Sequence, residues 1–139
     1  MDQAVLVNED KRAGLALVRA LEREGVPVTD AFWYELPETG RWRLFIVSPW
    51  VESRGLSEVY CHVTSTIQRM MPASIRLDDV TAIGEDDPIF RRLTATFAAR
   101  TDGVHIELPD TEFGGVDFGD VFIYRLNIPA QAVHSPRKR

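Results

Sequence analysis

The sequence predicts an α+β domain with a mixed, mostly antiparallel sheet of about five strands and three amphipathic helices. Three segments repeat apolar residues at helical spacing, and strand patterns occur in adjacent pairs joined by loops. Adjacent strands favour antiparallel pairing, whereas a doubly wound α/β fold would alternate strands with helices. The expected order of elements is α-β-β-α-β-α-β-β.

The length of 139 residues indicates one domain, which we place at residues 1–130. Residues 131–139 end in Arg137-Lys138-Arg139 and are expected to form a flexible basic tail. No apolar run is long enough to cross a membrane, and the N-terminus lacks the pattern of a secretory signal. The single cysteine, Cys61, cannot form a disulfide within the chain, which fits a reducing compartment. We therefore expect a cytoplasmic protein. Because no apolar run is long enough to span a membrane, we also expect no membrane partner.

The first helix is expected at residues 9–24. Asn8 is a fair N-cap, and Gly25 followed by Pro27 provides a stop. The apolar residues recur at positions i, i+3, i+4, i+7 and i+8, which define one face: Ala13, Ala16, Leu17, Ala20 and Leu21.

An aromatic hairpin is expected next, with strands at 31–36 and 41–48 and a turn at 37–40. A simple pairing sets Phe32 opposite Phe45 and Leu36 opposite Arg41. Side chains alternate between the two faces of a strand. One face then holds Ala31, Trp33, Glu35, Trp42, Leu44 and Ile46. The other face holds Phe32, Tyr34, Leu36, Phe45 and Val47, with Arg41 and Arg43 near the tip.

Both faces of this hairpin are largely apolar, although a strand with one face in water alternates apolar and polar residues. The strands are therefore either central and covered on both sides, or covered on one side and used for contact on the other. The contact can be a protein interface or a groove for an aromatic ligand, and a groove predicts a concave pocket between the hairpin and a helix. The expected binding surface consists of Trp33, Tyr34, Arg41, Trp42 and Arg43.

The rest of the chain supplies two helices and three strands. A helix at 56–70 precedes a strand at 80–83, and a helix beginning at Asp87-Pro88 ends before Asp102-Gly103. Two strands follow at 104–108 and 121–126. The apolar stripe of the 56–70 helix comprises Leu56, Val59, Tyr60, Val63, Ile67 and Met70. The inward residues of the following helix are Ile89, Phe90, Leu93 and Phe97.

Cys61 and His62 are adjacent on the 56–70 helix and point about 100° apart, so they do not form a nucleophile and base. Cys61 flanks the apolar stripe and is expected to be a small packed side chain. His62 lies four residues after Glu58, which predicts an ordinary surface pair.

A metal site is the alternative interpretation of the acidic C-terminal hairpin. His105 and Glu107 project to the same face of a strand, and Asp117 and Asp120 lie nearby in the sequence. Carboxylates and an imidazole can bind a divalent ion, as in a metal-dependent hydrolase or nuclease. The same residues can equally form the solvated face of an edge hairpin.

The net charge of −5 is unevenly distributed, because residues 74–120 carry 11 acids and 4 bases. This acidic middle does not favour nucleic acid, whose binding depends on neutralising phosphates. The sequence contains none of the glycine-rich phosphate loops, nor a GxSxG, HExxH or CxxC motif. We therefore expect no cofactor.

The segments Ala31-Phe32-Trp33-Tyr34, Trp42–Pro49 and Val121–Leu126 resemble a group of small uncharacterised bacterial proteins. The resemblance covers most of the chain apart from the tail. It implies a bacterial cytosolic setting and carries over no activity, cofactor or catalytic residue.

The leading hypothesis is a small non-enzymatic domain that binds a protein partner, or a second copy of itself as a homodimer, through the aromatic hairpin. It rests on the two apolar faces and on the lack of a convincing catalytic set. The alternative is the metal-dependent hydrolase or nuclease built on His105, Glu107 and the nearby acids.

Overall fold

The computed structural model describes residues 6, 8–70, 75–101, 106–107 and 116–126, with only the backbone described at 97–101, 106–107 and 116–117. The helices are α1 (Asn8–Arg23), α2 (Trp50–Ser53), α3 (Leu56–Arg69) and α4 (Pro88–Thr101), with a 3₁₀ turn η1 (Leu77–Asp79). The strands are β1 (Asp30–Glu35), β2 (Trp42–Val47), β3 (Val80–Ile83), β4 (Ile106–Glu107), β5 (Val116–Asp117) and β6 (Val121–Leu126). The α+β class is confirmed, whereas α2 and β5 were not predicted.

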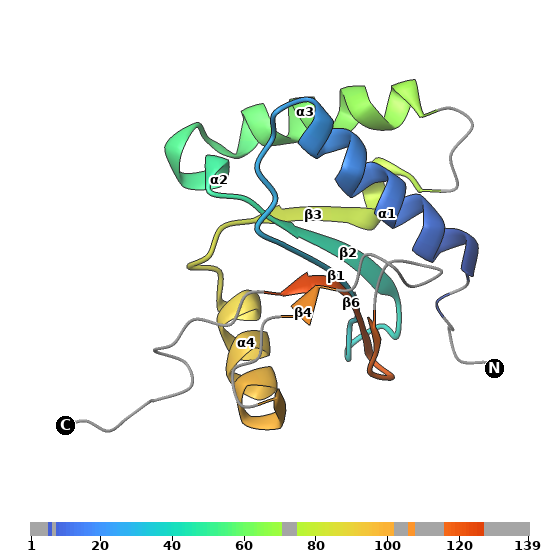
Figure 1. Ribbon diagram of the computed structural model, residues 1–139, viewed down its shortest axis with the longest axis vertical. Coiled ribbons are helices and arrows are strands. Elements are labelled where there is room, and N and C mark those ends of the chain that lie inside the picture. The colour runs from blue at the N-terminus through green and yellow to red at the C-terminus, as the bar shows by residue number, and fades with distance from the viewer. Residues whose placement is uncertain (1–5, 7, 71–74, 102–105, 108–115, 127–139) are drawn as a thin grey trace.

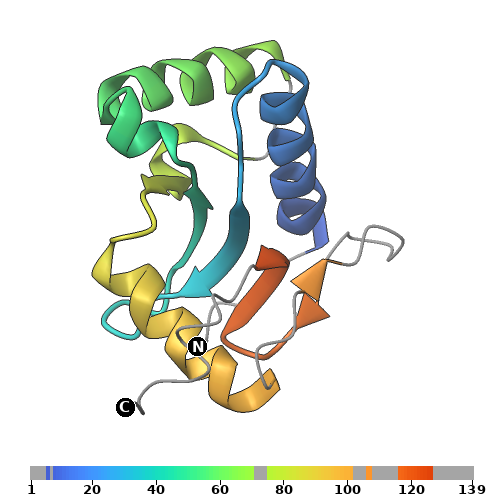
Figure 2. The same cartoon turned by 60° about the vertical axis from the view of Figure 1, so that its left-hand side comes forward.

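Four strands of four to six residues, β1, β2, β3 and β6, form the body of the sheet. The strand order is β3-β2-β1-β6-β4, and β5 also pairs with β6 (Figures 1 and 2). β2 and β3 are parallel, while the other pairings described are antiparallel, so the sheet is mixed. The predicted hairpin register is confirmed by the pairing of Phe32 with Phe45. The amide of Leu36 also donates to the carbonyl of Arg41 over 2.8 Å.

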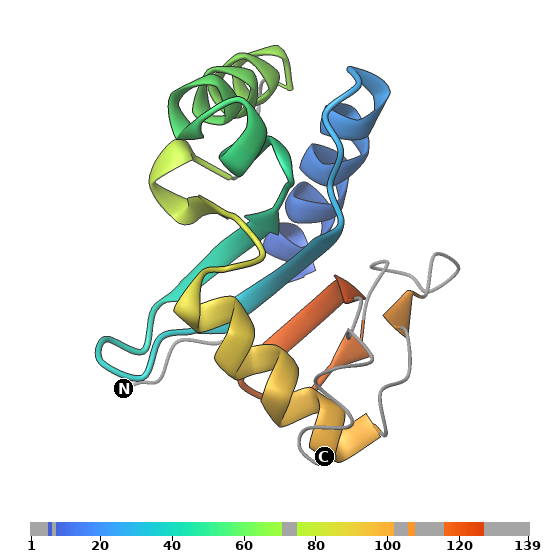
Figure 3. The same cartoon turned by 90° about the vertical axis from the view of Figure 1, so that its left-hand side faces the viewer.

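Helices cover both faces of the sheet, with α1 and α3 on one side and α4 on the other (Figure 3). The core therefore has two parts. The first lies under α1 and α3 and includes Leu17, Leu21, Val63, Trp33, Leu44, Ile46 and Phe122. The second lies under α4 and includes Phe90, Leu93, Phe32, Phe45, Val47, Val121 and Ile123. This division follows the two faces predicted for the hairpin, because each strand residue alternates between the layers.

Helix α1 ends at a glycine in the left-handed conformation, as the sequence indicated. Gly25 has a φ of 92°, and its amide donates to the carbonyl of Glu22 over 3.0 Å. The amide of Val26 donates to the carbonyl of Leu21 over 3.0 Å. This pair of bonds is the Schellman arrangement, which satisfies carbonyl groups left free at the helix end and turns the chain toward β1.

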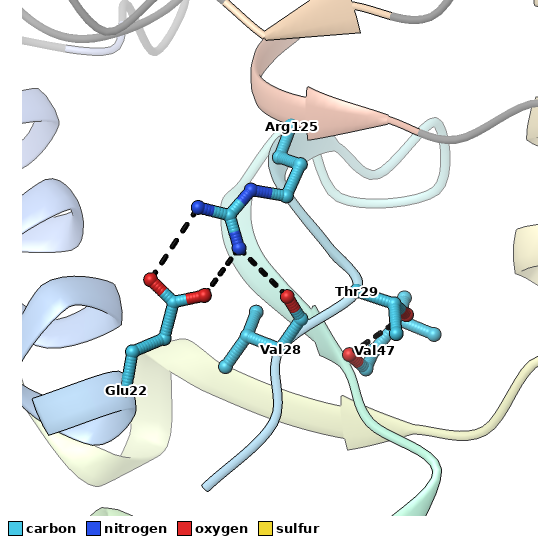
Figure 4. A network of polar contacts seen from close by, with 5 residues as sticks. All are labelled: Glu22, Val28, Thr29, Val47 and Arg125. Atoms are coloured by element: carbon cyan, nitrogen blue, oxygen red, sulfur yellow. Dashed lines mark hydrogen bonds and ion pairs between the residues drawn. The ribbon is translucent and has the colours of Figure 1, made fainter. Parts of the chain in front are cut away.

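A β-bulge in β6 changes the direction of one side chain. Phe32 pairs with Ile123 while the preceding residue, Ala31, pairs with Arg125, so Tyr124 is an extra residue. Tyr124 and Arg125 consequently both reach toward α1. Arg125 forms an ion pair with Glu22 of α1 and donates to the carbonyl of Val28 over 2.8 Å (Figure 4). The bulge thereby ties the end of β6 to the α1–β1 connection.

Candidate functional site

The aromatic hairpin occupies the centre of the sheet, since β1 lies between β2 and β6. Trp33, placed by the sequence on a binding surface, is only 3% exposed and belongs to the core under α1. Its placement on a binding surface is therefore wrong. The physical reason is that β6 and two helical layers surround β1, so both of its apolar faces are used for packing.

Trp33 belongs to a buried polar network between the sheet and α1. Its indole Nε1–H donates to the phenol oxygen of Tyr124 over 2.9 Å, and the Tyr124 hydroxyl donates to the carbonyl of Lys11. Burial raises the pKa of the Tyr124 phenol above its ordinary value. Helix α1 passes close to this pair at Gly14, where a Cβ atom would lie 2.4 Å from the Tyr124 hydroxyl oxygen. These contacts give Trp33 a structural role.

The other residues of the expected binding surface differ in their surroundings. The Arg43 guanidinium donates to Thr81 Oγ1 over 2.8 Å and to the carbonyls of Asp78 and Val80 over 2.7 and 3.2 Å. Arg43 therefore holds η1 and β3 against β2. Trp42 is half-buried against the α1 core, and Arg41 is exposed at the hairpin tip.

The residues of the expected metal site are described only in part. His105 lies outside the described residues, and only the backbone is described at Glu107 and Asp117. Glu107 pairs with Arg125 and Asp117 pairs with Phe122, so their backbones lie about 10 Å apart along β6. Asp120 is exposed in the turn that follows. No group of three or more potential metal-ligating side chains occurs among the described residues.

The 56–70 helix also departs from its predicted packing. Val59 and Val63 are buried as expected, but Leu56 is 46% exposed and Cys61 is exposed. The prediction of a packed Cys61 is therefore wrong, because the buried stripe turns toward Thr66 and leaves Cys61 on the outer side. The His62 ring packs against Trp50 at 5.4 Å between centroids, while Glu58 pairs with Arg54.

A cavity of about 130 Å³ lies between the sheet and α4, and we call it the α4 cavity. Its apolar lining consists of Ile89, Leu93 and Val121. Its polar lining consists of Tyr34, Arg92, Thr96 and Asp120. The four residues from α4 follow the spacing i, i+3, i+4 and i+7, so they form one helical face directed at the sheet.

The wall opposite α4 is built by a tight turn held against β1. The amide of Phe118 donates to the carbonyl of Val121 over 2.8 Å, and Gly119 between them has a φ of 95°. The amide of Glu35 donates to the carbonyl of Asp120 over 2.9 Å, which fixes this turn on β1. Val121 pairs with Tyr34, so the aromatic ring and the turn carboxylate come from adjacent positions of the sheet.

The α4 cavity combines an apolar floor with polar groups of opposite charge. The Tyr34 ring packs against Phe45 with centroids 6.3 Å apart, which supports its position. Thr96 Oγ1 donates to the carbonyl of Arg92 over 3.0 Å, so the same oxygen can still accept a hydrogen bond. A concave site with an apolar floor and a few polar groups is typical of small-molecule binding.

Comparison with known proteins gives no match: no family model, no curated protein and no solved structure matches this chain. None of the described helices is long and apolar enough to cross a membrane. The tail expected at 131–139 lies outside the described residues.

Proposed function

We propose that this chain is a small-molecule-binding domain whose ligand occupies the α4 cavity. The supporting observation is the concave lining, in which aliphatic side chains of α4 and β6 lie beside the Tyr34 phenol, the Arg92 guanidinium and the Asp120 carboxylate. The groove hypothesis predicted a pocket between the aromatic hairpin and a helix, and Tyr34 of the hairpin lines this one. The proposal thus retains the binding role predicted from the sequence, but moves it from the surface of the aromatic hairpin to the α4 cavity.

The volume limits the size of the ligand. An apolar cavity of about 150 Å³ holds a benzene molecule, so about 130 Å³ fits a body of similar size. Arg92, Thr96 and Asp120 are exposed, so polar ligand groups can stay in contact with water while the apolar part is buried. We therefore propose a compact ligand with an apolar body and a polar end.

A fragment titration followed by amide NMR tests this function. We expect saturable shifts of the amides of Tyr34, Leu93 and Val121 with small amphipathic fragments. The variant Thr96→Trp places an indole at the rim and should abolish these shifts. Ala95→Trp adds the same ring at an exposed neighbouring position outside the lining and should retain them. Fragments that shift only other regions, or that bind Thr96→Trp equally, would contradict the proposal.

A second candidate keeps the protein contact predicted from the sequence and restricts it to the hairpin tip. The observation that favours it is exposure: residues 37–39 and Arg41 are exposed, and the turn lies at the outer edge of the molecule (Figure 3). A second copy of the chain is the partner that can be tested directly. Sedimentation velocity across a concentration series should show a dimer that Arg41→Glu weakens, and a monomer at all concentrations would remove this candidate.

We also propose a bacterial cytoplasmic setting. The resemblance described above and the presence of one cysteine, which is exposed at Cys61, support it.

A further inference from the structure

We propose that the ligand of the α4 cavity is a small zwitterion with a branched aliphatic body, in the class of the short α-amino acids. The proposal rests on the binding function above and assigns the chemistry of the ligand. Its basis is that the lining presents one cationic and one anionic side chain, Arg92 and Asp120, beside an aliphatic floor.

The two charges come from different elements. Arg92 lies on α4, and Asp120 lies in the turn between β5 and β6. Within the described part of the chain neither side chain takes part in an ion pair, although the neighbouring Arg91 pairs with Asp86 over 2.8 Å. Arg92 and Asp120 are thus available to a ligand from two sides of the cavity.

A ligand with one charge meets a conflict in this site. A simple carboxylate can bind the Arg92 guanidinium but lies near the like-charged Asp120, and a simple amine has the reverse problem with Arg92. A zwitterion satisfies both groups, because its carboxylate accepts from the guanidinium and its ammonium donates to the carboxylate. Opposite charges in the lining therefore select for opposite charges in the ligand.

The uncharged residues of the lining fit the aliphatic side chain of such a zwitterion. Ile89, Leu93 and Val121 are branched aliphatic residues, and Leu93 and Val121 are buried. Within the described residues the Tyr34 hydroxyl forms no hydrogen bond, so it can bond to a ligand carboxylate. A branched side chain of about three or four carbons matches a floor of this size.

The test compares three probes that share one branched aliphatic body. L-valine carries both charges, isobutylamine lacks the carboxylate, and 3-methylbutanoate lacks the ammonium. Each is titrated into the full chain and followed by amide NMR at Tyr34, Leu93 and Val121. We expect L-valine to bind at least about tenfold more tightly than either singly charged probe. Equal affinities for the three probes would overturn the zwitterion assignment.

Variants of the two charges decide which contacts produce the preference. Asp120→Asn should lower the affinity for L-valine to that for 3-methylbutanoate, and Arg92→Gln should lower it to that for isobutylamine. Arg91→Gln and Glu38→Gln remove the same charges from exposed positions outside the lining and should leave the affinity unchanged. An L-valine affinity that survives both cavity variants would contradict the proposal.

The binding function and the ligand class can fail separately, and the measurements distinguish the two cases. If the fragments shift the cavity amides and Thr96→Trp removes the shifts, but L-valine shows no preference, only the ligand class is wrong. If neither the fragments nor the three probes shift the amides of Tyr34, Leu93 and Val121, the α4 cavity is not a binding site.

Discussion

The indole Nε1 of Trp33 lies 2.9 Å from the phenol oxygen of Tyr124, to which it donates a hydrogen bond, and the two residues are 91 positions apart in the chain. Tyr124 accepts this bond and donates its own hydrogen to the carbonyl of Lys11 in α1. One phenol group thus connects β1, β6 and the first helix. Because both aromatic side chains are buried, each polar atom lost from this network leaves a partner without water to replace it.

Tyr124→Phe should destabilise the domain by about 1–3 kcal/mol, the usual cost of a buried donor left unpaired. The substitution keeps the ring that packs edge-on against Phe122, with centroids 5.3 Å apart, and removes only the hydroxyl. The free energy of unfolding from urea denaturation measures the change. Stability equal to that of the unaltered chain would show that the hydroxyl contributes nothing.

A double-mutant cycle isolates the Trp33–Tyr124 hydrogen bond. Trp33→Phe costs more than the hydrogen bond alone, because it also opens a cavity beside α1. Once the indole donor is absent, Tyr124→Phe no longer orphans it. The double variant should therefore be more stable than the sum of the single effects predicts, by about 0.5–1.5 kcal/mol. Strict additivity in urea denaturation would contradict a coupling between these atoms.

Gly14→Ala should lower the stability, although alanine is favoured over glycine by about 1 kcal/mol within a helix. The added methyl group would lie 2.4 Å from the Tyr124 hydroxyl oxygen and 2.7 Å from Trp33 Nε1, and both groups are held in the core. We expect a loss of about 1–3 kcal/mol from this overpacking. At the exposed position Ala16 the preference is ordinary, so Ala16→Gly should cost about 1 kcal/mol. Thermal denaturation of the two variants checks both signs, and a stabilised Gly14→Ala would refute the close contact.

The sequence was sufficient to predict the hairpin register, because alternation along each strand and the 37–40 turn leave one consistent pairing. It did not predict the direction of Arg125. Strict alternation places Arg125 on the face of Ile123, whereas the bulge at Tyr124 directs it to Glu22. A bulge depends on the partner strand and on the helix packed over it, so one strand considered alone does not reveal it.

The α4 cavity was foreseen only as a pocket of unspecified position between the hairpin and a helix. The α4 wall of the cavity could be predicted from the sequence, since Arg92 and Thr96 have the helical spacing that places them on the same face as Ile89 and Leu93. The opposite wall could not be predicted, because the pairing of β6 with β1 brings Asp120 beside Tyr34 across 86 residues of sequence. Such non-local contacts depend on the strand order, which spacing along the chain does not determine.

Arg43 and Arg41 should respond differently to substitution, although both were assigned to one surface. Arg43→Ala removes hydrogen bonds to Thr81, Asp78 and Val80, and should cost about 1–3 kcal/mol in the free energy of unfolding. Arg41 is exposed and lies just before β2, so Arg41→Ala should change the free energy of unfolding by no more than about 0.5 kcal/mol. Urea denaturation of the matched pair tests this, and equal effects would place both side chains in the same role.

Asp10→Asn should stabilise the domain at neutral pH. Burial raises the pKa of the Asp10 carboxyl, and the charges of Asp79 and Glu9 raise it further. A raised folded-state pKa means that the folded chain binds this proton more tightly than the unfolded chain. The contribution of Asp10 to stability therefore falls as the pH rises above its unfolded-state pKa of about 4. Replacing the carboxyl should give a gain at pH 7 that disappears below pH 4.

Glu24→Gln is the matched comparison, because its pKa shift has the opposite sign. The hydrogen bond from Arg69 is the main cause that lowers the pKa of Glu24, and Thr66 donates to the same carboxylate over 3.1 Å. A lowered folded-state pKa gives stability that is present at neutral pH and lost as the pH falls through the folded-state pKa. Glu24→Gln should therefore be less stable than the unaltered chain at pH 7 and approach it in acid. Denaturation midpoints measured from pH 3 to pH 7 should show the two differences with opposite signs, and parallel curves would contradict both assignments.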